Sequence, residues 1–214
     1  LGQQLFYRNK HYLRTTQAGK LYIDSAKEIL RIKKNTYAQL EDLNCMWNQL
    51  TSLDVSHNPE LTELDCRRNQ MTGLDVRREQ KLTALYCGNN QLQVLDVSQN
   101  QNLTSLDCSH NQLSVVDVSR NQSLKTLDCS DNLLSSLDVS GNTELTVLLC
   151  GQNQLKELDI SKNIGLQSLS CGNNQLTSLD LSGHSELMGL FCGGNQLTNL
   201  DVDGTNVGPR DDGG

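Results

Sequence analysis

Residues 103–123 read LTSLDCSHNQLSVVDVSRNQS, and this stretch decides the fold because it recurs, with variations, from about residue 43 to residue 207. Cysteines mark the period most clearly. Eight of them follow one another at intervals of 21 residues, at positions 45, 66, 87, 108, 129, 150, 171 and 192. A fixed period in this range is the signature of a solenoid, in which each repeat stacks on the last.

Each period has two related halves, L-x-x-L-x-C-x-x-N-x and L-x-x-L-D-V-S-x-N-x-x. Alternating apolar and polar residues predict a short strand with one buried face, with Leu61, Leu64 and Cys66 inward and Glu63 and Asp65 outward. Ten or eleven residues per half leave no room for a regular helix on the return path. We therefore predict a β-rich solenoid of parallel short strands and turns with little regular helix, advancing about 4.8 Å per repeat.

This pattern resembles the leucine-rich repeats, specifically their short 21-residue bacterial class. The resemblance implies a ladder of asparagines whose side-chain amides satisfy backbone groups of their own and neighbouring turns. Eight asparagines fill that position: Asn48, Asn69, Asn90, Asn111, Asn132, Asn153, Asn174 and Asn195.

The cysteines take the place of the second leucine of the family's L-x-L motif, where a small apolar side chain packs readily. Neighbouring coils bring such cysteines within disulfide distance, but their Cβ bonds point side by side, and each would have two equivalent neighbours. We expect reduced, structural thiols, with disulfide or metal roles as the alternative. The sequence has no C-x-x-C motif, its four histidines lack ligand spacing, and we predict neither a metal nor a cofactor.

A column of aspartates also keeps the period, as in Asp96, Asp117 and Asp138. Eight carboxylates at one spacing suggest calcium binding, but the glycine-rich nonapeptides of calcium-binding β-rolls are absent. We expect each carboxylate instead to accept a hydrogen bond from the backbone that follows it, as in an Asx turn.

The outward strand positions vary from coil to coil. In leucine-rich repeats this strand face is commonly the surface that binds a partner, and exposed aromatic residues are typical anchors of interfaces. The alternative is neutral variation of a solvated surface. The residues expected to contact a protein partner are Glu63, Asp65, Tyr86, Asp107, Asp128, Val147, Leu149 and Phe191.

Residues 1–43 lack the repeat and carry a charge of +4, whereas the remainder carries −11. Thr16 is placed to cap one long helix from about residue 17 to residue 40. The stretch resembles the wing and linker helix of LysR-type transcriptional regulators, in Leu1-Gly2, Leu5-Phe6, Arg8 and the run Thr15–Gly19, with a threonine where that family usually has leucine. The resemblance implies a basic wing at residues 9–14 and a possible homodimer through helix 17–40. Four residues would then meet DNA phosphates: Arg8, Lys10, His11 and Arg14.

The helix-turn-helix of that family would precede residue 1, so we expect DNA binding only if such a segment stands upstream. The expected organisation is a partial LysR-like head at 1–43, repeats at 44–207 and a disordered tail at 208–214. The leading hypothesis is a protein-interaction module of a transcriptional regulator. The alternative is a stand-alone bacterial surface or secreted binding protein, in which the head only caps the solenoid.

Enzymatic activity is not expected, because serines and aspartates that recur in every repeat behave as scaffold rather than as catalytic residues. The chain has no run of 18 apolar residues, so we expect no membrane span. Reduced cysteines and the lack of a visible signal peptide favour the cytoplasm, or secretion if an upstream signal has been lost.

Overall fold

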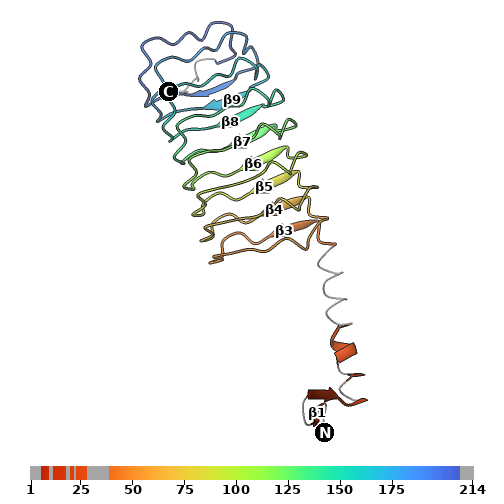
Figure 1. Cartoon of the computed structure of the whole chain (residues 1–214). Helices are drawn as coiled ribbons and strands as arrows, with labels where there is room; N and C mark the ends of the chain where they lie inside the picture. The colour runs from red at the N-terminus through yellow and green to blue at the C-terminus, as the bar shows by residue number, and fades with distance from the viewer. Residues whose placement is uncertain (1–5, 10–11, 18–19, 22, 28–38, 208–214) are drawn as a thin grey trace, which may run out of the picture. The chain divides into compact units, whose positions relative to one another are not determined.

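The computed structural model describes residues 6–9, 12–17, 20–21, 23–27 and 39–207. It divides into two compact units, residues 1–40 and residues 41–214. The first unit contains an antiparallel pair of strands, β1 (Phe6–Asn9) and β2 (Tyr12–Thr15), joined in register from Phe6–Thr15 to Asn9–Tyr12. The second unit is a stack of coils (Figure 1).

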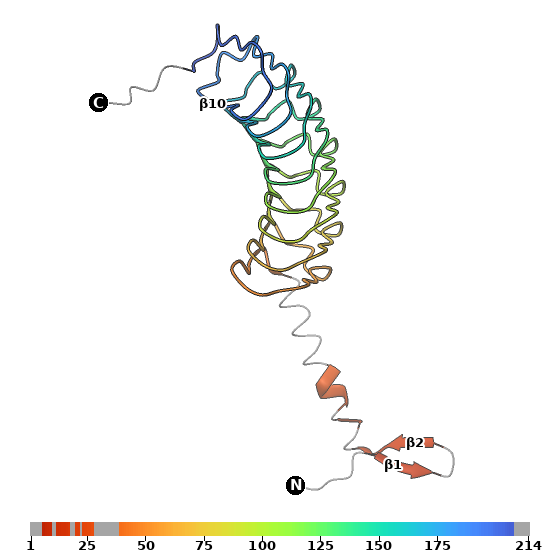
Figure 2. The ribbon, with the colours of Figure 1, turned by 90° about the vertical axis from the view of Figure 1, so that its left-hand side faces the viewer.

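The coils of the second unit share one parallel sheet of eight strands, ordered β3 to β10 as in the sequence. Each strand has three residues and pairs with its neighbours at a register shift of 21 residues, so that Leu106 lies beside Leu85 and Leu127. The stack curves, with β10 drawn on the inner side of the bend (Figure 2). The strands are β3 (Asp42–Asn44), β4 (Glu63–Asp65), β5 (Ala84–Tyr86), β6 (Ser105–Asp107), β7 (Thr126–Asp128), β8 (Val147–Leu149), β9 (Ser168–Ser170) and β10 (Gly189–Phe191).

The core runs along the axis of the stack and is filled by leucine, valine and cysteine. In the coil that starts at Leu103, the side chains of Leu103, Leu106, Cys108, Leu113 and Val118 are fully buried. Burial of each such leucine contributes roughly 1.5–3 kcal/mol, so a narrow core without bulky aromatic side chains is sustained by repetition. The predicted parallel β-solenoid with little helix is confirmed over these coils.

The Asn111 amide shows how each coil is joined to the previous one. Its Nδ2 donates to the carbonyl of Cys108 in the same coil at 3.1 Å and to that of Cys87 in the preceding coil at 3.2 Å. Its Oδ1 accepts from the backbone nitrogen of Leu92 at 2.9 Å. The same pattern repeats along the column, so backbone groups at the turn are satisfied although they are buried.

A second ladder lies on the other side of the coil, where the sequence analysis assigned no role to the side chains. Asn121 Nδ2 donates to the carbonyls of Val97 at 3.0 Å and Asn100 at 2.8 Å, both in the preceding coil. Asn100, Asn142 and Asn163 each donate to the two equivalent carbonyls of the coil before their own. Glu79 and His184 occupy the same position in two other coils.

The long helix predicted for residues 17–40 is not shown. Residues 17, 20–21 and 23–27 are helical, and the backbone nitrogen of Lys20 donates to the carbonyl of Thr16 at 2.9 Å, which fits a helix start at Thr16. Residue 39 lies in a turn and Leu40 lies outside any helix, while residues 28–38 fall outside the described residues. Leu40 stands 21 residues before Leu61, so its backbone already follows the repeat and leads into β3.

The expected boundary between the head and the repeats lay between residues 43 and 44. The first strand of the solenoid, β3, begins before it, at Asp42. The carbonyl of Glu41 accepts hydrogen bonds from the backbone nitrogens of Thr62 at 2.7 Å and Glu63 at 3.2 Å. β3 then pairs in parallel with β4.

Candidate functional site

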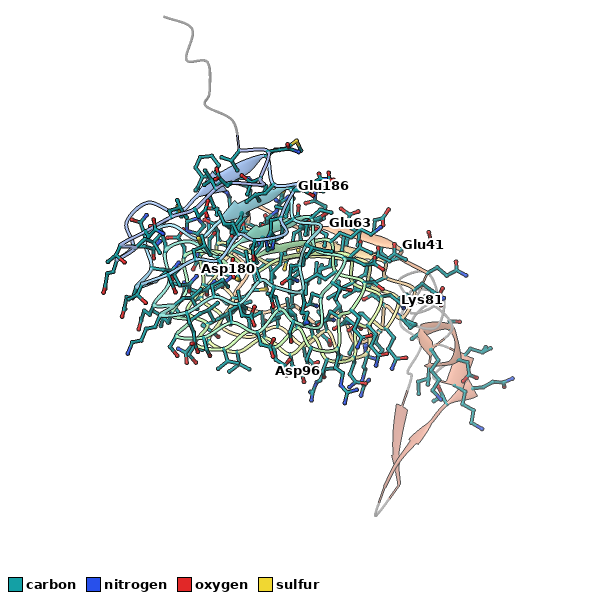
Figure 3. The ribbon with its side chains drawn as sticks, turned by 90° about the horizontal axis from the view of Figure 1, so that it is seen from above. Glu41, Glu63, Lys81, Asp96, Asp180 and Glu186 are labelled. Carbon is teal, nitrogen blue, oxygen red and sulfur yellow. The ribbon has the colours of Figure 1, made fainter. Side chains whose placement is uncertain are left out.

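The outward side chains of β4 to β10 form one surface, which we call the strand face. Because the strands are in register, residues 21 apart are neighbours on this face, about 4.8 Å apart. Figure 3 looks down the stack and shows Glu63 beside the strands, with Asp96 of the aspartate column on the opposite side of the coils. The two acidic sets of the sequence thus belong to different surfaces.

Exposure along the strand face is uneven. Glu63 is exposed, while Tyr86, Asp107, Asp128, Val147 and Leu149 are half-buried by their neighbours. Phe191, the aromatic residue of β10, has 51% of its surface exposed.

Asp65 was expected to point freely outward, but only 4% of its surface is exposed. The guanidinium of Arg67 covers it, with Nε 3.0 Å from Oδ1 and Nη2 2.7 Å from Oδ2 of the carboxylate. Burial alone would raise the pKa of Asp65, but the hydrogen bonds and charge of Arg67 lower that pKa below its ordinary value. Alternation predicts only whether a side chain points inward or outward. It could not show that Arg67, two residues further along the chain, covers Asp65.

Arg67 also reaches the next two coils. Its guanidinium lies 4.9 Å from the centroid of the Tyr86 ring and 3.8 Å from Oδ2 of Asp107. The acidic end of the strand face therefore already holds one cation between a carboxylate, an aromatic ring and a second carboxylate.

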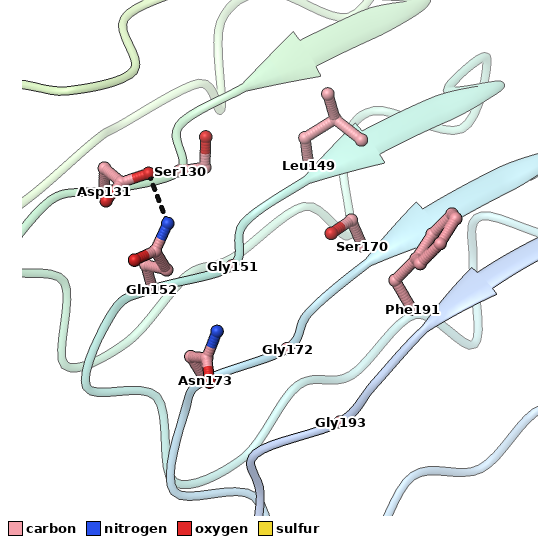
Figure 4. Close-up of a pocket in the computed structure, with 10 residues that line it drawn as sticks. All are labelled: Ser130, Asp131, Leu149, Gly151, Gln152, Ser170, Gly172, Asn173, Phe191 and Gly193. Atoms are coloured by element: carbon pink, nitrogen blue, oxygen red, sulfur yellow. Dashed lines mark hydrogen bonds between the residues drawn. The ribbon is translucent and has the colours of Figure 1, made fainter.

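A hollow of about 380 Å³ opens at the C-terminal end of the strand face (Figure 4). Leu149, Ser170 and Phe191 line it from the ends of β8, β9 and β10. Its other residues come from the turns after these strands and after β7: Ser130, Asp131, Gly151, Gln152, Gly172, Asn173 and Gly193.

Three glycines explain why the hollow exists. Gly151, Gly172 and Gly193 stand one residue after the ladder cysteines in three consecutive coils. In the earlier coils the same position holds Arg67, Ser109 and Ser130, with a single isolated glycine at Gly88. A Cβ on Gly172 would come within 2.9 Å of the carbonyl oxygen of Gly193, so this backbone packs too closely for a side chain. This hollow was not predicted from the sequence, although three consecutive glycines spaced 21 residues apart indicate a position without side chains.

The part of the hollow that is lined by the turns after the strands is polar. Gln152 Nε2 donates to Oδ2 of Asp131 at 2.8 Å, and His110 Nε2 lies 3.4 Å from the same oxygen. Asp131 and Gln152 adopt left-handed backbone conformations, with φ of 52° and 54°, as do the equivalent residues of the other coils. This conformation turns the chain sharply after each strand, at the residues whose side chains line the polar part of the hollow.

The aspartate column behaves as a turn element. Asp117 Oδ1 accepts from the backbone nitrogen of Ser119 at 3.0 Å, and hydrogen bonds from Ser119 lower the pKa of Asp117. Among the described residues, no group of three or more histidine, cysteine, aspartate or glutamate side chains could hold a metal ion.

The cysteines are free thiols, and Cys66 to Cys171 are buried while Cys45 and Cys192 at the ends are half-buried. Burial raises the pKa of Cys66 and of Cys171 to about 12. Thiols with such values stay protonated near neutral pH and are poor nucleophiles and poor metal ligands.

The basic residues expected to contact DNA are only partly described. Arg8 lies in β1 and Arg14 in β2, whereas Lys10 and His11 fall outside the described residues. Within the described part of the chain, no helix is long and apolar enough to cross a membrane.

Comparison with known proteins agrees with the repeat interpretation. Residues 101–142 match the family of leucine-rich repeats in two copies. No curated protein matches the chain by sequence at a significant level. The resemblance of residues 1–43 to LysR-type regulators finds no support in these comparisons.

Solved structures of Listeria monocytogenes proteins are similar to this chain. The functional domain of InlJ, described as including a cysteine ladder, is 31% identical over 77% of this chain and 46% of its own length, with a TM-score of 0.63. Internalin C2 is 20% identical over 81% of this chain and 80% of its own, with a TM-score of 0.77. Internalin InlF is 23% identical over 76% and 57%, with a TM-score of 0.62.

The chain therefore spans less than half of the InlJ domain, and its likeness to the other two concerns the fold alone. Residues 101–142 are thus leucine-rich repeats, and the second unit as a whole is a parallel β-solenoid whose fold is similar to that of the Listeria internalins.

Proposed function

We propose that this solenoid is a protein-binding module that contacts its partner through the strand face. The observation that carries the proposal is the C-terminal half of that face. There Val147, Leu149 and Phe191 occupy outward positions that the core does not need, and Phe191 is 51% exposed beside the 380 Å³ hollow. Exposed aromatic and aliphatic side chains around a concavity are typical anchors for a protein partner.

A second apolar patch provides the competing surface. Val94 and Val115 are 73% and 67% exposed, and they lie in the half-repeats that follow the asparagine ladder rather than on the strand face. This patch has no aromatic residue and no hollow formed by consecutive glycines, so we assign it no partner.

Site-specific photo-crosslinking distinguishes the two surfaces. A photoreactive phenylalanine analogue is placed at Ser170 in the hollow or, as the matched control, at Val115, and crosslinks are compared in the producing cells and at their surface. We expect one discrete protein adduct from position 170 and none from position 115. Equal labelling from both positions, or adducts from 115 alone, would refute binding through the strand face.

A second proposal concerns residues 1–43. β1 and β2 pair antiparallel, and their strands contain Arg8 and Arg14, two of the four residues expected to contact DNA phosphates. The acidic body opposes DNA binding, and phosphate contacts alone do not read sequence. We therefore expect weak binding that is indifferent to sequence and falls steeply with salt. A salt titration with specific and scrambled duplexes tests this, and binding that is absent at low salt would leave the hairpin without a role on DNA.

A further inference from the structure

The row of side chains just before the ladder cysteines changes character along the stack. In strand order it reads Asp65, Tyr86, Asp107, Asp128, Leu149, Ser170 and Phe191, and each residue is the register partner of the next. The first half of the row is acidic apart from Tyr86, and the second half is apolar apart from Ser170. A partner that crosses the strands meets both kinds of surface.

Arg67 shows how the acidic half accommodates a cation. Its guanidinium makes two hydrogen bonds to Asp65, of 3.0 Å and 2.7 Å, and lies over the ring of Tyr86. A two-pronged contact between a guanidinium and a carboxylate is stronger and more directional than a hydrogen bond between neutral side chains. The chain thus supplies its own example of an arginine bound on this row.

The next carboxylates, Asp107 and Asp128, have no such arginine of their own coil. Serines stand at the position of Arg67, and the hydroxyl of Ser130 donates to Asp128 Oδ1 at 2.6 Å. In the solenoid as described, no lysine or arginine forms an ion pair with Asp128, while Arg67 reaches Asp107 only at 3.8 Å. Burial and then repulsion by Asp107 raise the pKa of Asp128 above its ordinary value, although Ser130 opposes the change.

Two carboxylates side by side on adjacent strands repel each other, and a cation placed between them removes that repulsion. The hollow adjoins this pair, since Ser130 from the coil of Asp128 already lines it. On its strand side, Ser170 stands between Leu149 and Phe191. At about 4.8 Å per strand, the middle of the carboxylate pair and the place of Ser170, between Leu149 and Phe191, are about 12 Å apart.

We propose that the strand face binds a protein segment that places one lysine or arginine on the Asp107–Asp128 pair and one bulky apolar side chain in the hollow between Leu149 and Phe191. This inference rests on the proposed function and adds the chemistry of the partner. An extended segment rises about 3.3 Å per residue, so the two side chains stand three or four residues apart in such a ligand.

The test is selection of a phage-displayed library of random 12-residue peptides on the full chain. Selected peptides are then synthesised, and their affinities are measured by fluorescence anisotropy. We expect enrichment of a basic residue followed or preceded, at a distance of three or four residues, by leucine, phenylalanine or another bulky apolar residue.

Two pairs of variants locate the bound peptide. Asp128→Asn removes the charge but keeps an oxygen that can accept from Ser130, and Asp117→Asn is the same change in the aspartate column on the other side of the coil. Gly193→Val places a side chain at the hollow where a Cβ meets no atom within 4 Å, and Gly73→Val does the same away from the strand face. At both chosen glycines a Cβ therefore fits without a clash.

We expect Asp128→Asn and Gly193→Val each to weaken a selected peptide about tenfold, because each removes one of two anchoring contacts. Asp117→Asn and Gly73→Val should leave the affinity unchanged. Replacement of the peptide's basic residue by glutamine should cause the same loss as Asp128→Asn, and the two changes should not add, since they remove one interaction.

The remaining outcomes separate the two proposals. Peptides that are weakened by Gly193→Val but carry no basic residue, or that ignore Asp128→Asn, would overturn this inference and leave the strand face as a binding surface. Peptides that ignore both strand-face variants, or a selection that yields no binder, would overturn the inference and count against the proposed function as well.

Discussion

Asn100 donates a side-chain hydrogen bond of 2.9 Å to the backbone carbonyl of Glu79, but the Glu79 side chain makes no equivalent bond to the coil before it. Glu79 occupies the position of the second asparagine ladder and is fully buried. Neither carboxylate oxygen has a hydrogen-bond partner of good geometry, and the nearby backbone amides of Arg78 and Glu79 only partly offset the effect of burial on the pKa of Glu79. A buried carboxylate without partners is costly, so this coil is a weak point of the stack.

Glu79→Asn should stabilise the solenoid by about 1–3 kcal/mol, because the amide can donate to the previous coil as Asn100 does and no charge is buried. Glu79→Gln separates the two effects, since it removes the charge without restoring the length of asparagine. Urea unfolding followed by circular dichroism measures both variants. A Glu79→Asn variant no more stable than the natural chain would contradict the ladder explanation.

The gain from Glu79→Asn should depend on pH. Burial raises the pKa of Glu79 in the folded state above its value in the unfolded chain. The stability contributed by this group is therefore fully present below the unfolded pKa of about 4.3 and is lost as pH rises through the folded pKa. Unfolding at pH 4 and pH 7 should show the larger gain at pH 7, and an equal gain at both values would argue against a buried charge.

Asn111→Ala should destabilise the chain by about 1–3 kcal/mol, because it leaves the buried Leu92 nitrogen without its acceptor. It also removes one of the two amide donors to each of the carbonyls of Cys87 and Cys108, which keep Asn90 and Asn132. The matched control is Asn48→Ala at the exposed end of the same ladder, whose bonds reach only Cys45 and Met46. Thermal unfolding should show a clearly smaller loss for Asn48→Ala. Similar losses at both ends would mean that burial does not set the value of this ladder.

The thiols should react in order of their place in the stack. At pH 8, iodoacetamide should label Cys45 and Cys192 first, while Cys66 to Cys171 react only after denaturation, because burial keeps the inner thiols protonated. Peptide mass mapping of briefly labelled protein identifies the sites. Rapid labelling of Cys108 in the folded chain would show that the core is open.

Cys108→Ala should cost about 1–2 kcal/mol through lost core packing. Cys108→Ser should cost more, since it buries a hydroxyl group where the thiol packed. Denaturant unfolding of the two variants gives the comparison, and a serine variant as stable as the alanine variant would show that the hydroxyl finds a partner.

Gly172→Ala should destabilise the solenoid by about 1–3 kcal/mol, whereas Gly193→Ala should be nearly neutral. A Cβ on Gly172 would lie 2.9 Å from the Gly193 carbonyl, while a Cβ on Gly193 meets nothing within 4 Å. Thermal melting of both variants decides the point. Equal melting temperatures would mean that the floor of the hollow adjusts to a side chain.

The period of 21 residues determined most of the fold by itself. Because the strands stack in parallel and in register, the neighbours of any residue are those 21 positions before and after it, so the columns could be read from the sequence. Leu61, Leu64 and Cys66 were predicted to point inward in one repeat, and they are fully buried. Residues 1–43 contain no repeat against which a prediction could be checked. The helix predicted for residues 17–40 therefore included Leu40, which lies outside any helix and already follows the repeat.

Only the tertiary structure decided which outward residues form a site. Asp65 and Asp128 have the same place in the repeat, yet Arg67 closes over one, and the other is left with a serine. The hollow arises because the glycines at 151, 172 and 193 become adjacent, and the backbone of one coil then approaches the next too closely for a side chain. A repeat pattern fixes direction, inward or outward, because direction follows from local backbone geometry. Accessibility depends on the size and charge of the side chains that stacking brings together, and those differ from coil to coil.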